Sequence, residues 1–567
     1  MRETYGSVRN SLAARRTNRF KIKLCGGNET QENNSDEKII LTDSYKPSES
    51  DSGRGLINAR PLLFAAVSLA FSIFLSLKTF ENSALRVFVV AVTLSLFGLS
   101  LFLGIKRKIK AGVCALIALA FFVGGYAYGA CKIEKLESAS YYVDAVVVSG
   151  KVSGVKDRDS YAILTLTNVY VNSEKINGNV RVYVSSPNKR NVRLPEKFET
   201  VKFTAELNKA ADEERAFDYL KSGISYVSSP SDEIIIIGDG ANLFEKCQKY
   251  ISGALKSFVS SQNYGVVSAM LLGDSSGVSE QTLDMFRTAG IAHVFAVSGL
   301  HIGLFASALG ALCKLLKIKR LKRTLIVLIP TFVYVGACGF TASAVRAFIM
   351  TAAIIVSSVF GVKHDGLSAL STAAIVILAA RPFAVFEYGF LLSFAAVGGI
   401  TLLARKLERG ASALPSFLKS SVSVCLAAQL GTLPILTQMS GYISIISTFA
   451  NLLFLPALSL IYQTVTVLTV VSLPFYAFGV NAGRVLLFVP DAVLSLVTKV
   501  ISLVNYDTFA LPFSFGSGII FYYAALFFSS DVVNGKKVNK FAVVTVSLPR
   551  ARFLRRWAYE PRLKLNK

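Results

Sequence analysis

The chain has 567 residues, 52% of them hydrophobic, and a mean hydropathy of +0.50. Repeated apolar runs of membrane-spanning length exclude an ordinary soluble protein and predict a polytopic α-helical membrane protein. The formal net charge of +25 suggests nucleic-acid binding, but the basic residues form short blocks beside apolar runs. That placement is the one that orients membrane helices, with the positive blocks in the cytosol.

The N-terminal part divides into a polar tail and a first membrane region. Residues 1–58 include the acidic, Asn-rich segment NETQENNSDEK, and this composition predicts a disordered cytosolic tail rather than a signal peptide. Apolar runs near 61–77, 86–105 and 111–130 predict three transmembrane helices within residues 59–131. The segment that follows is therefore expected outside the cell.

The polar insert, residues 138–240, is predicted to be a small extracytoplasmic all-β domain. Segments such as YAILTLTNVYV, NVRVYVSS and ETVKFTAEL are β-branched or aromatic and are separated by turn residues. About five strands in about 100 residues suit an OB-like barrel, which can bind a DNA strand by stacking its bases on aromatic side chains. The candidate DNA contacts are Tyr161, Tyr170, Tyr183, Lys189, Arg190 and Arg193. Because the insert is nearly neutral, a purely structural cap over the membrane region is the alternative.

An amphipathic helix, LFEKCQKYISGALKSFV, leads into a second membrane region at 262–530. Its apolar runs lie near 294–315, 324–341, 344–361, 367–380, 387–404, 417–437, 442–475 and 481–530. An even total of ten or twelve spans leaves both chain ends in the cytosol, including a basic tail at 531–567. The run 442–475 holds Asn451, Pro456 and Pro474, which predict a broken or re-entrant segment lining a cavity.

The segment HVFAVSGLH places two of the chain's three histidines, His293 and His301, around Ser298. Ser298 and His301 are three residues apart, which predicts one shared helix face near the outer end of a span. Small residues at four-residue spacing predict close helix packing along Gly299, Gly303, Ser307 and Ala311. The alternative for His301 is an ordinary hydrogen bond to a neighbouring helix.

Further polar residues lie within apolar runs at the same predicted depth: Arg346, Glu387, Gln429 and Asn451. A charge inside a bilayer costs roughly 2.5–3.5 kcal/mol and usually faces a bundle interior or a water-filled path. A polar lumen is therefore predicted. The alternative is that Arg346 reaches the membrane surface or pairs with Glu387 for purely structural reasons.

Four segments resemble the ComEC-type competence family in order and spacing: LLGDSSGVSEQTLDMFRTAGIAHVFAVSGLHIGL, SAVRAFIM, RPFAVFEYGFLLSFAAVGGI and QLGTLPILTQMSGYISIISTFANLLFLPALSL. The resemblance covers about 60–525, and AFDYLKSGISY is similar to the end of that family's OB-like region. It implies a channel in the bacterial cell membrane that carries one strand of incoming DNA into the cytoplasm during natural transformation. Other competence proteins and membrane lipid are the further partners it implies.

The resemblance also implies the family's motif positions in this chain. They are His293, Ser298, Gly299, His301, Arg346, Gly389, Ser393, Gln429, Pro434, Asn451 and Pro456, and Glu387 joins the candidate channel-lining residues through its predicted depth. On this interpretation Arg346 meets passing phosphates. Ser298, His301, Gln429 and Asn451 offer neutral groups that guide the strand without trapping it.

Longer members of that family end in a metallo-β-lactamase-like domain with a His-x-His-x-Asp-His metal cluster. Here the third histidine, His364, stands alone in GVKHDG, and the seven cysteines are scattered singly. We therefore expect no hydrolase activity, no metal site and no cofactor, with any nuclease supplied by a separate protein. Oligomeric state is left open.

Two other functions fit parts of the sequence. A small-solute transporter would bind its substrate at a broken helix, although we find no convincing internal repeat of the kind such proteins carry. An intramembrane serine hydrolase would use Ser298 as nucleophile and His301 as base, which needs a hydrogen bond between the two side chains.

Overall fold

The structure is a computed structural model in which the described residues all fall within one compact unit. They are 61–81, parts of 87–98, 109–137, 145–157, 161–185, 193–212, 215–362, 365–411, 415–444, 447–480, 482–503, 510–512 and 516–529. Both predicted tails, most of the predicted span at 86–105, and Lys189, Arg190 and His364 lie outside these ranges.

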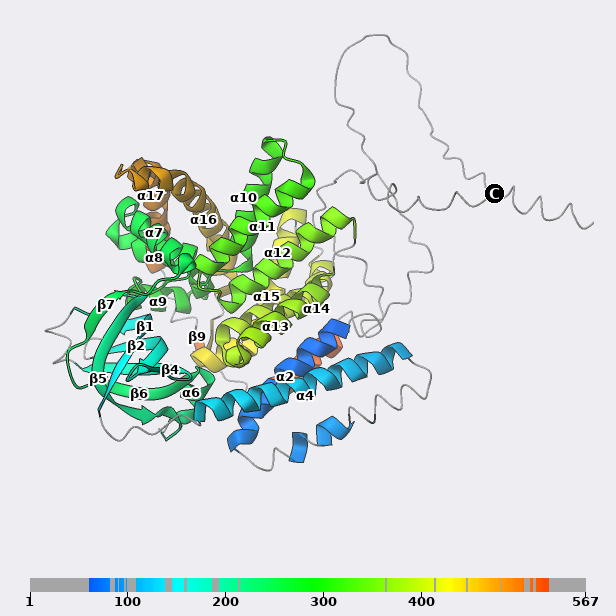
Figure 1. Ribbon diagram of the computed structural model, residues 1–567. Coiled ribbons are helices and arrows are strands. Elements are labelled where there is room, and N and C mark those ends of the chain that lie inside the picture. The colour runs from blue at the N-terminus through cyan, green and yellow to red at the C-terminus, as the bar shows by residue number, and fades with distance from the viewer. Residues whose placement is uncertain are drawn as a thin grey trace, which may run out of the picture. The chain divides into compact units, whose positions relative to one another are not determined.

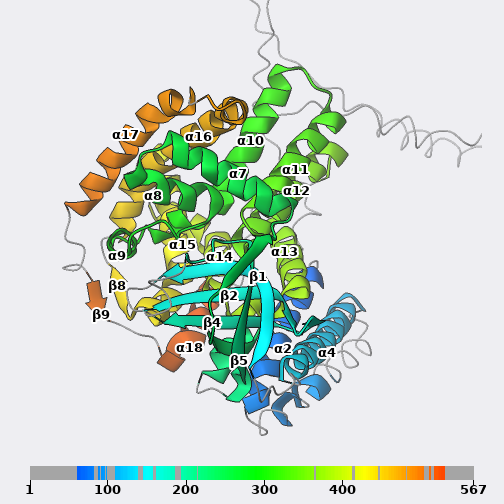
Figure 2. The ribbon, with the colours of Figure 1, turned by 60° about the vertical axis from the view of Figure 1, so that its left-hand side comes forward.

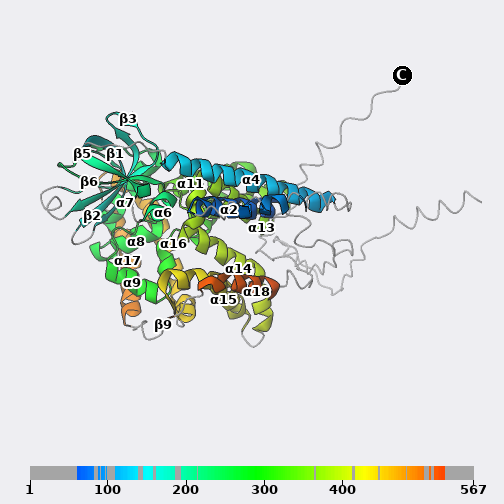
Figure 3. The same ribbon diagram turned by 90° about the horizontal axis from the view of Figure 1, so that it is seen from below.

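Two N-terminal helices lie side by side (Figure 3), α2 (Pro61–Glu81) and α4 (Ile109–Glu137). Small residues bring their backbones together, because a methyl group on Gly125 would collide with Ser72 and one on Gly129 would collide with Ser76. This is the close small-residue contact that holds helices together in lipid. Two of the three predicted N-terminal helices are thus confirmed as helices.

The insert forms a closed five-stranded β-barrel with two short additional strands (Figures 1 and 2). The barrel strands are β1 (Val146–Asp157), β2 (Tyr161–Val171), β4 (Asn179–Ser185), β5 (Glu199–Lys209) and β6 (Ile224–Pro230). They follow the order β1-β2-β4-β6-β5, and β5 pairs back with β1 to close the barrel. The β4–β6 pair is parallel and the other barrel pairs are antiparallel. β3 (Glu174–Lys175) adds to β2, and β7 (Ile235–Asp239) adds to β5.

Alternating side chains explain why these segments form a barrel. Along β2, inward residues such as Leu164 and Leu166 are fully buried, while the residues between them are not. They fill the interior together with side chains from the other strands, including Phe203 and Tyr226. A short cover, η3 (Ala210–Asp212) and α6 (Ala216–Lys221), lies between β5 and β6 in the chain. The β nature predicted from the sequence is therefore confirmed.

The amphipathic helix α7 (Leu243–Phe258) follows the barrel, as predicted. Asn242 and Glu245 cap its first turn reciprocally, with hydrogen bonds of 3.0 Å and 2.7 Å. Glu245 also forms an ion pair with Lys151 of β1, whose Nζ lies 2.8 Å from Oε1. A second ion pair, Lys197 with Asp274 at 3.7 Å, joins the barrel to the loop after α8. These contacts connect the barrel to the helical region.

The helical region starts with α8 (Ser261–Leu272), α9 (Glu280–Thr288), η4 (Ala292–Phe295), α10 (Gly299–Leu315), α11 (Arg320–Ala337), α12 (Ala342–Phe360) and α13 (Gly366–Ala380). It continues with η5 (Pro382–Phe386), α14 (Tyr388–Gly410), α15 (Ser416–Ser440), β8 (Tyr442–Ser444), α16 (Ser447–Ala477), α17 (Ala482–Ser502), β9 (Ala510–Pro512), η7 (Gly516–Gly518) and α18 (Ile519–Ser529). Within the described ranges, seven helices are long and apolar enough to cross a membrane: α2, α4, α12, α14, α15, α16 and α17. α10 and α13 are shorter apolar helices. The total of ten or twelve spans stays a prediction.

The predicted break in the run 442–475 is wrong, because α16 is one continuous helix of 31 residues with Pro456 and Pro474 inside it. A proline removes one backbone hydrogen bond and bends a helix, and packing against neighbours can hold the two parts together. The buried side chains of Leu458 and Tyr462 fix α16 in the largest hydrophobic core, which it shares with α7, α8 and α17.

α14 and α15 cross at two glycines. A methyl group added to Gly399 would lie 2.9 Å from the Cα of Gly431, and one added to Gly431 would lie 3.0 Å from the Cα of Gly399. Each would also collide with a carbonyl oxygen of the opposite helix. The crossing is therefore possible only without side chains at both positions.

Pro434 in α15 leaves the Leu430 carbonyl without its usual backbone donor. The hydroxyl of Tyr522 in α18 donates to that carbonyl at 2.7 Å, and the hydroxyl of Tyr523 donates to the Gly431 carbonyl at 2.9 Å. A helix interior at membrane depth tolerates proline when neighbouring side chains satisfy the freed carbonyls. Tyr522 performs that role here, and Tyr523 adds a second hydrogen bond to the next carbonyl of α15.

Candidate functional site

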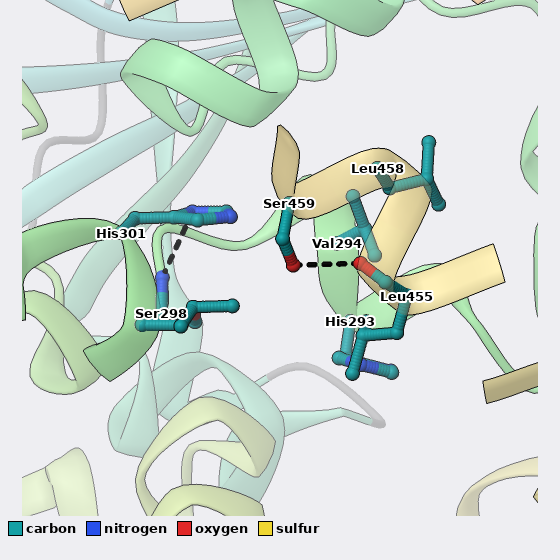
Figure 4. Close-up of a pocket in the computed structure, with 8 residues that line it drawn as sticks. His293, Val294, Ser298, His301, Leu455, Leu458 and Ser459 are labelled. Carbon is teal, nitrogen blue, oxygen red and sulfur yellow. Dashed lines mark hydrogen bonds between the residues drawn. The ribbon is translucent and has the colours of Figure 1, made fainter. Parts of the chain in front are cut away.

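A pocket of about 120 Å³ lies where α10 begins, between the preceding loop and α16 (Figure 4). It is lined by His293, Val294, Ser298, Leu300, His301, Leu455, Leu458 and Ser459. The structure thus brings the two histidines and the serine of the HVFAVSGLH segment to one place. α16 contributes a second hydroxyl, that of Ser459, which sequence reasoning missed.

Ser298 is the residue before α10 rather than part of it, because the helix begins at Gly299 and not near residue 294 as predicted. The backbone N–H of Ser298 donates to Nδ1 of His301 at 3.3 Å. A neutral imidazole whose Nδ1 accepts carries its proton on Nε2. In Figure 4 the opposite edge of the His301 ring points toward Ser459. His301 therefore presents a neutral N–H donor to the pocket.

Two tyrosines from distant segments fix the His301 ring. The ring stacks on that of Tyr462 in α16, with centroids 4.0 Å apart and planes 16° apart. The Tyr462 hydroxyl lies 2.9 Å from the hydroxyl of Tyr334 in α11, which donates to the Leu271 carbonyl of α8 at 2.6 Å. Sequence reasoning missed both tyrosines. A single tyrosine inside an apolar run was the available signal, because a buried hydroxyl requires a hydrogen-bond partner.

Arg346 lies in α12 beside the start of α10, with only 8% of its surface exposed. Its Nη2 is 3.4 Å from the position that a methyl group on Gly299 would occupy, and its Nη1 is 3.9 Å from the sulfur of Met350. Its Nε is buried without a hydrogen-bond partner, and no carboxylate of the described residues forms an ion pair with it. The suggested pairing with Glu387 is wrong, because Glu387 lies 3.5 Å from Arg381.

The remaining motif residues lie on other helices. The Nδ2 of Asn451 in α16 donates to the Gly290 carbonyl at 3.5 Å, and its buried Oδ1 has no partner among the described residues. The buried hydroxyl of Ser393 in α14 likewise has none within the described ranges. Gln429 lies on α15. Asn451, Ser393 and Gln429 are not among the residues that line the pocket.

The predicted packing stripe on α10 is wrong beyond Gly299, where α12 does come close. A methyl group on Gly303 would have nothing within 4 Å, and Ser307 and Ala311 are exposed. The helix instead buries Ile302 and Ala306, on the face directly beside this stripe. Four-residue spacing identifies one helix face, but the larger apolar side chains decide which face contacts the neighbours.

On the barrel, two of the predicted aromatic contacts meet. The rings of Tyr161 and Tyr183 are 6.3 Å apart, and 36% of Tyr161 is exposed. Tyr183 also forms a hydrogen bond with Tyr219 in α6, with 3.2 Å between the two hydroxyl oxygens. Tyr170 is exposed on the same strand as Tyr161, and Arg193 is engaged in ion pairs with two glutamates.

One cation near this pair was missed by sequence reasoning. The guanidinium of Arg181 in β4 lies 5.3 Å from the centroid of the Tyr219 ring. Arg181 is also two residues from Tyr183 along the strand, so both side chains leave the same face. Within the described part of the chain, no three His, Cys, Asp or Glu side chains gather as a metal site.

A family model described as Competence protein matches residues 270–530. The chain is also 28% identical over 267 residues to ComE operon protein 3 of Bacillus subtilis (strain 168). That match covers 47% of this chain and 33% of the relative, so the chain spans about a third of the curated protein that it matches. No solved structure matches the chain.

Proposed function

Because residues 270–530 belong to the competence protein family, we propose that the protein carries one strand of DNA across the bacterial cell membrane into the cytoplasm during natural transformation. The observation that supports this most is the start of α10. There a family motif forms a pocket with neutral polar side chains, next to a buried arginine for which the described residues offer no carboxylate partner.

The chemistry of this region suits a moving polyanion. A conducting path needs contacts favourable enough for entry and weak enough for release. His301, Ser298 and Ser459 offer neutral groups, and Arg346 adds a single positive charge. A cluster of buried cations would hold phosphates too tightly, because each phosphate contact adds electrostatic affinity. Asn451, Ser393, Gln429 and Glu387 extend the proposed path on α14, α15 and α16.

We also propose that the barrel lies outside the cell, with both chain ends and the basic turn between α10 and α11 in the cytosol. The test places single cysteines at Lys175 in β3 or at Lys317 after α10, in a variant without native cysteines. The first is expected to react with a membrane-impermeant maleimide in intact cells, and the second only after lysis. The opposite labelling pattern would invert the proposed orientation.

The barrel is proposed to meet the strand first. Its strand order, the parallel β4–β6 pair and the closing β5–β1 pair support an OB-like fold. The adjacent rings of Tyr161 and Tyr183, with Arg181 on the same face as Tyr183, suit base stacking beside a phosphate. Tyr161→Ala is expected to weaken binding of oligothymidylate to the full chain, and Tyr161→Phe is expected to preserve it. Equal loss in both variants would contradict stacking.

The main test is DNA uptake in a deletion strain, with the wild-type gene returned as control. Deletion is expected to abolish both transformation and the entry of labelled DNA into the cytoplasm. Unchanged transformation would overturn the proposal and leave the solute-transporter alternative. Other competence proteins, including a separate nuclease, are the partners that this function requires.

The serine-hydrolase alternative lacks support from the geometry. Nδ1 of His301 accepts from the backbone of Ser298, so that nitrogen is not available to take the proton of the Ser298 hydroxyl. A fluorophosphonate probe is therefore expected to leave Ser298 unlabelled. Labelling that disappears in Ser298→Ala would favour the enzyme instead.

A further inference from the structure

We propose that Arg346 and the N-terminal end of α10 form a binding site for a single phosphate group. Its ligand class is a phosphodiester or phosphate anion. The identification of that phosphodiester with the backbone of a moving DNA strand rests on the proposed function. The anion site itself does not, because it follows from the side chain and the helix end alone.

The first argument is the state of the guanidinium. An arginine carries five N–H donors and a permanent charge, and burying such a group without partners is costly. Arg346 is more than nine-tenths buried, yet among the described residues its Nε has no hydrogen-bond partner, and its Nη1 donates to a weakly accepting sulfur, that of Met350, at 3.9 Å. A buried cation in this state lacks an anion.

The second argument is the end of α10. The first N–H groups of a helix have no acceptor within the helix, and the helix dipole makes that end positive. A cation beside it is repelled unless an anion lies between them. The hydroxyl of Ser343, at the start of α12, donates at 2.8 Å to the Val297 carbonyl in the loop before α10. This bond holds Arg346 next to the start of α10.

The third argument is access. Nη2 of Arg346 approaches α10 at Gly299, which has no side chain. It lies 3.4 Å from the point where a methyl group on Gly299 would stand. One turn further along α10, a methyl group on Gly303 would have nothing within 4 Å. At Gly299 the methyl position also lies 3.8 Å from Cβ of Ala347, so the open space among the described residues lies at Gly303, one turn from the guanidinium. A planar guanidinium can then bind two oxygens of one phosphate at once.

The test uses the purified full chain in a phosphate-free maltoside detergent at low salt, with dimethyl phosphate as probe. Binding to the folded protein is expected to raise its thermal unfolding midpoint as the probe concentration rises. Arg346→Leu is expected to abolish the rise. Arg346→Lys is expected to weaken the apparent affinity by about threefold to tenfold, because charge remains but the paired donors are lost.

Gly299→Ala provides a variant that tests the site without removing the charge. A methyl group there meets Nη2 at an ordinary contact distance, so the protein is expected to fold, and alanine is a better helix former than glycine. The methyl group would occupy the approach to the guanidinium, so the affinity for dimethyl phosphate is expected to fall by about tenfold. Arg287→Leu is the matched control, because Arg287 is an exposed guanidinium paired with Asp284, and its loss is expected to leave the response unchanged.

Competition identifies the source of the phosphodiester. Oligothymidylate is expected to compete with dimethyl phosphate. Competition by phosphatidylglycerol alone would assign the site to a lipid headgroup and overturn its link to the strand. The phosphate site would be refuted if dimethyl phosphate did not raise the unfolding midpoint, or raised it equally in wild type, Arg346→Leu and Gly299→Ala. Either result would leave the deletion test of DNA uptake unaffected. Conversely, an Arg346-dependent rise with normal uptake in the deletion strain would preserve the site and refute the proposed function.

Discussion

The crossing of α14 and α15 and the start of α10 both depend on glycine, but they use it in opposite ways. At the crossing, Gly399 and Gly431 allow two backbones to touch, and the carbonyl freed by Pro434 receives a tyrosine hydroxyl. At the start of α10, the described residues leave nothing within 4 Å of a methyl group on Gly303, and they offer no partner to the Nε of Arg346 beside Gly299. Glycine spacing alone therefore does not distinguish packing from access. The two roles are distinguished by whether neighbouring polar side chains have hydrogen-bonding groups without a partner.

The difference between the two regions predicts which substitutions reduce stability and which reduce function. Satisfied polar groups and close packing contribute to folding, whereas a buried charge without a partner costs free energy in the membrane. Variants at the crossing should therefore lose stability. Variants that replace the polar groups of α10 and α12 by hydrophobic ones should keep it.

The largest effect is expected at the α14–α15 crossing. Gly431→Val would force the two helices apart, and overpacking of this kind costs about 3 kcal/mol of unfolding free energy. The measurement is reversible unfolding of the purified chain in mixed detergent and SDS micelles. Gly303→Ala is the matched control and is expected to change stability little, because its methyl group meets no neighbour. Equal stability of the two variants would remove the distinction between the regions.

A smaller loss of unfolding free energy is expected in the hydroxyl network of Tyr334 and Tyr462, which supports the His301 ring. Tyr334→Phe leaves the buried Leu271 carbonyl without this donor, which costs about 1–3 kcal/mol. Tyr250→Phe is the control, because its hydroxyl donates to the Leu473 carbonyl from a side chain that is 41% exposed, where water can replace it. The same unfolding assay compares them. If Tyr334→Phe costs no more than Tyr250→Phe, the network does not hold His301 in place.

The smallest effect concerns Pro434. Tyr522→Phe is expected to cost about 1 kcal/mol, because the Leu430 carbonyl loses its donor. In a Pro434→Ala background the cost should nearly vanish, since the backbone N–H restored at position 434 can bond the same carbonyl. A double-mutant cycle measures this coupling. Additive costs would show that the tyrosine contributes packing only.

Sequence patterns predicted the elements whose apolar residues recur at a regular spacing within one segment. The strands of the barrel and the amphipathic helix α7 follow from periods of two and of about 3.6 residues, each visible within one segment. Most of the apolar runs became helices near the expected bounds. The start of α10 differs from the prediction because the apolar run begins before the helix, whereas a serine before the first turn, here Ser298, is the usual starting signal.

The contacts that define the site could not be predicted in this way, because they join residues far apart in the chain. Tyr334 and Tyr462 meet across 128 positions, and both stabilise a histidine from a third helix. A helix period gives the face on which a residue lies, but not the neighbour on that face. The alternative pairing of Arg346 with Glu387 failed for a different reason, because Glu387 pairs with a nearby residue of its own segment, Arg381.

The most direct test of the account compares DNA uptake with membrane abundance in His301→Leu and Arg346→Leu. Both are expected to insert at wild-type abundance, because a hydrophobic side chain removes the cost of a polar group in the bilayer. Uptake of labelled DNA per inserted protein is expected to fall by at least about tenfold, because a polyanion passes an apolar constriction poorly. His364→Leu, which replaces the third histidine, serves as control and should transport normally. Normal uptake by both variants at wild-type abundance would contradict the account and assign His301 and Arg346 to packing.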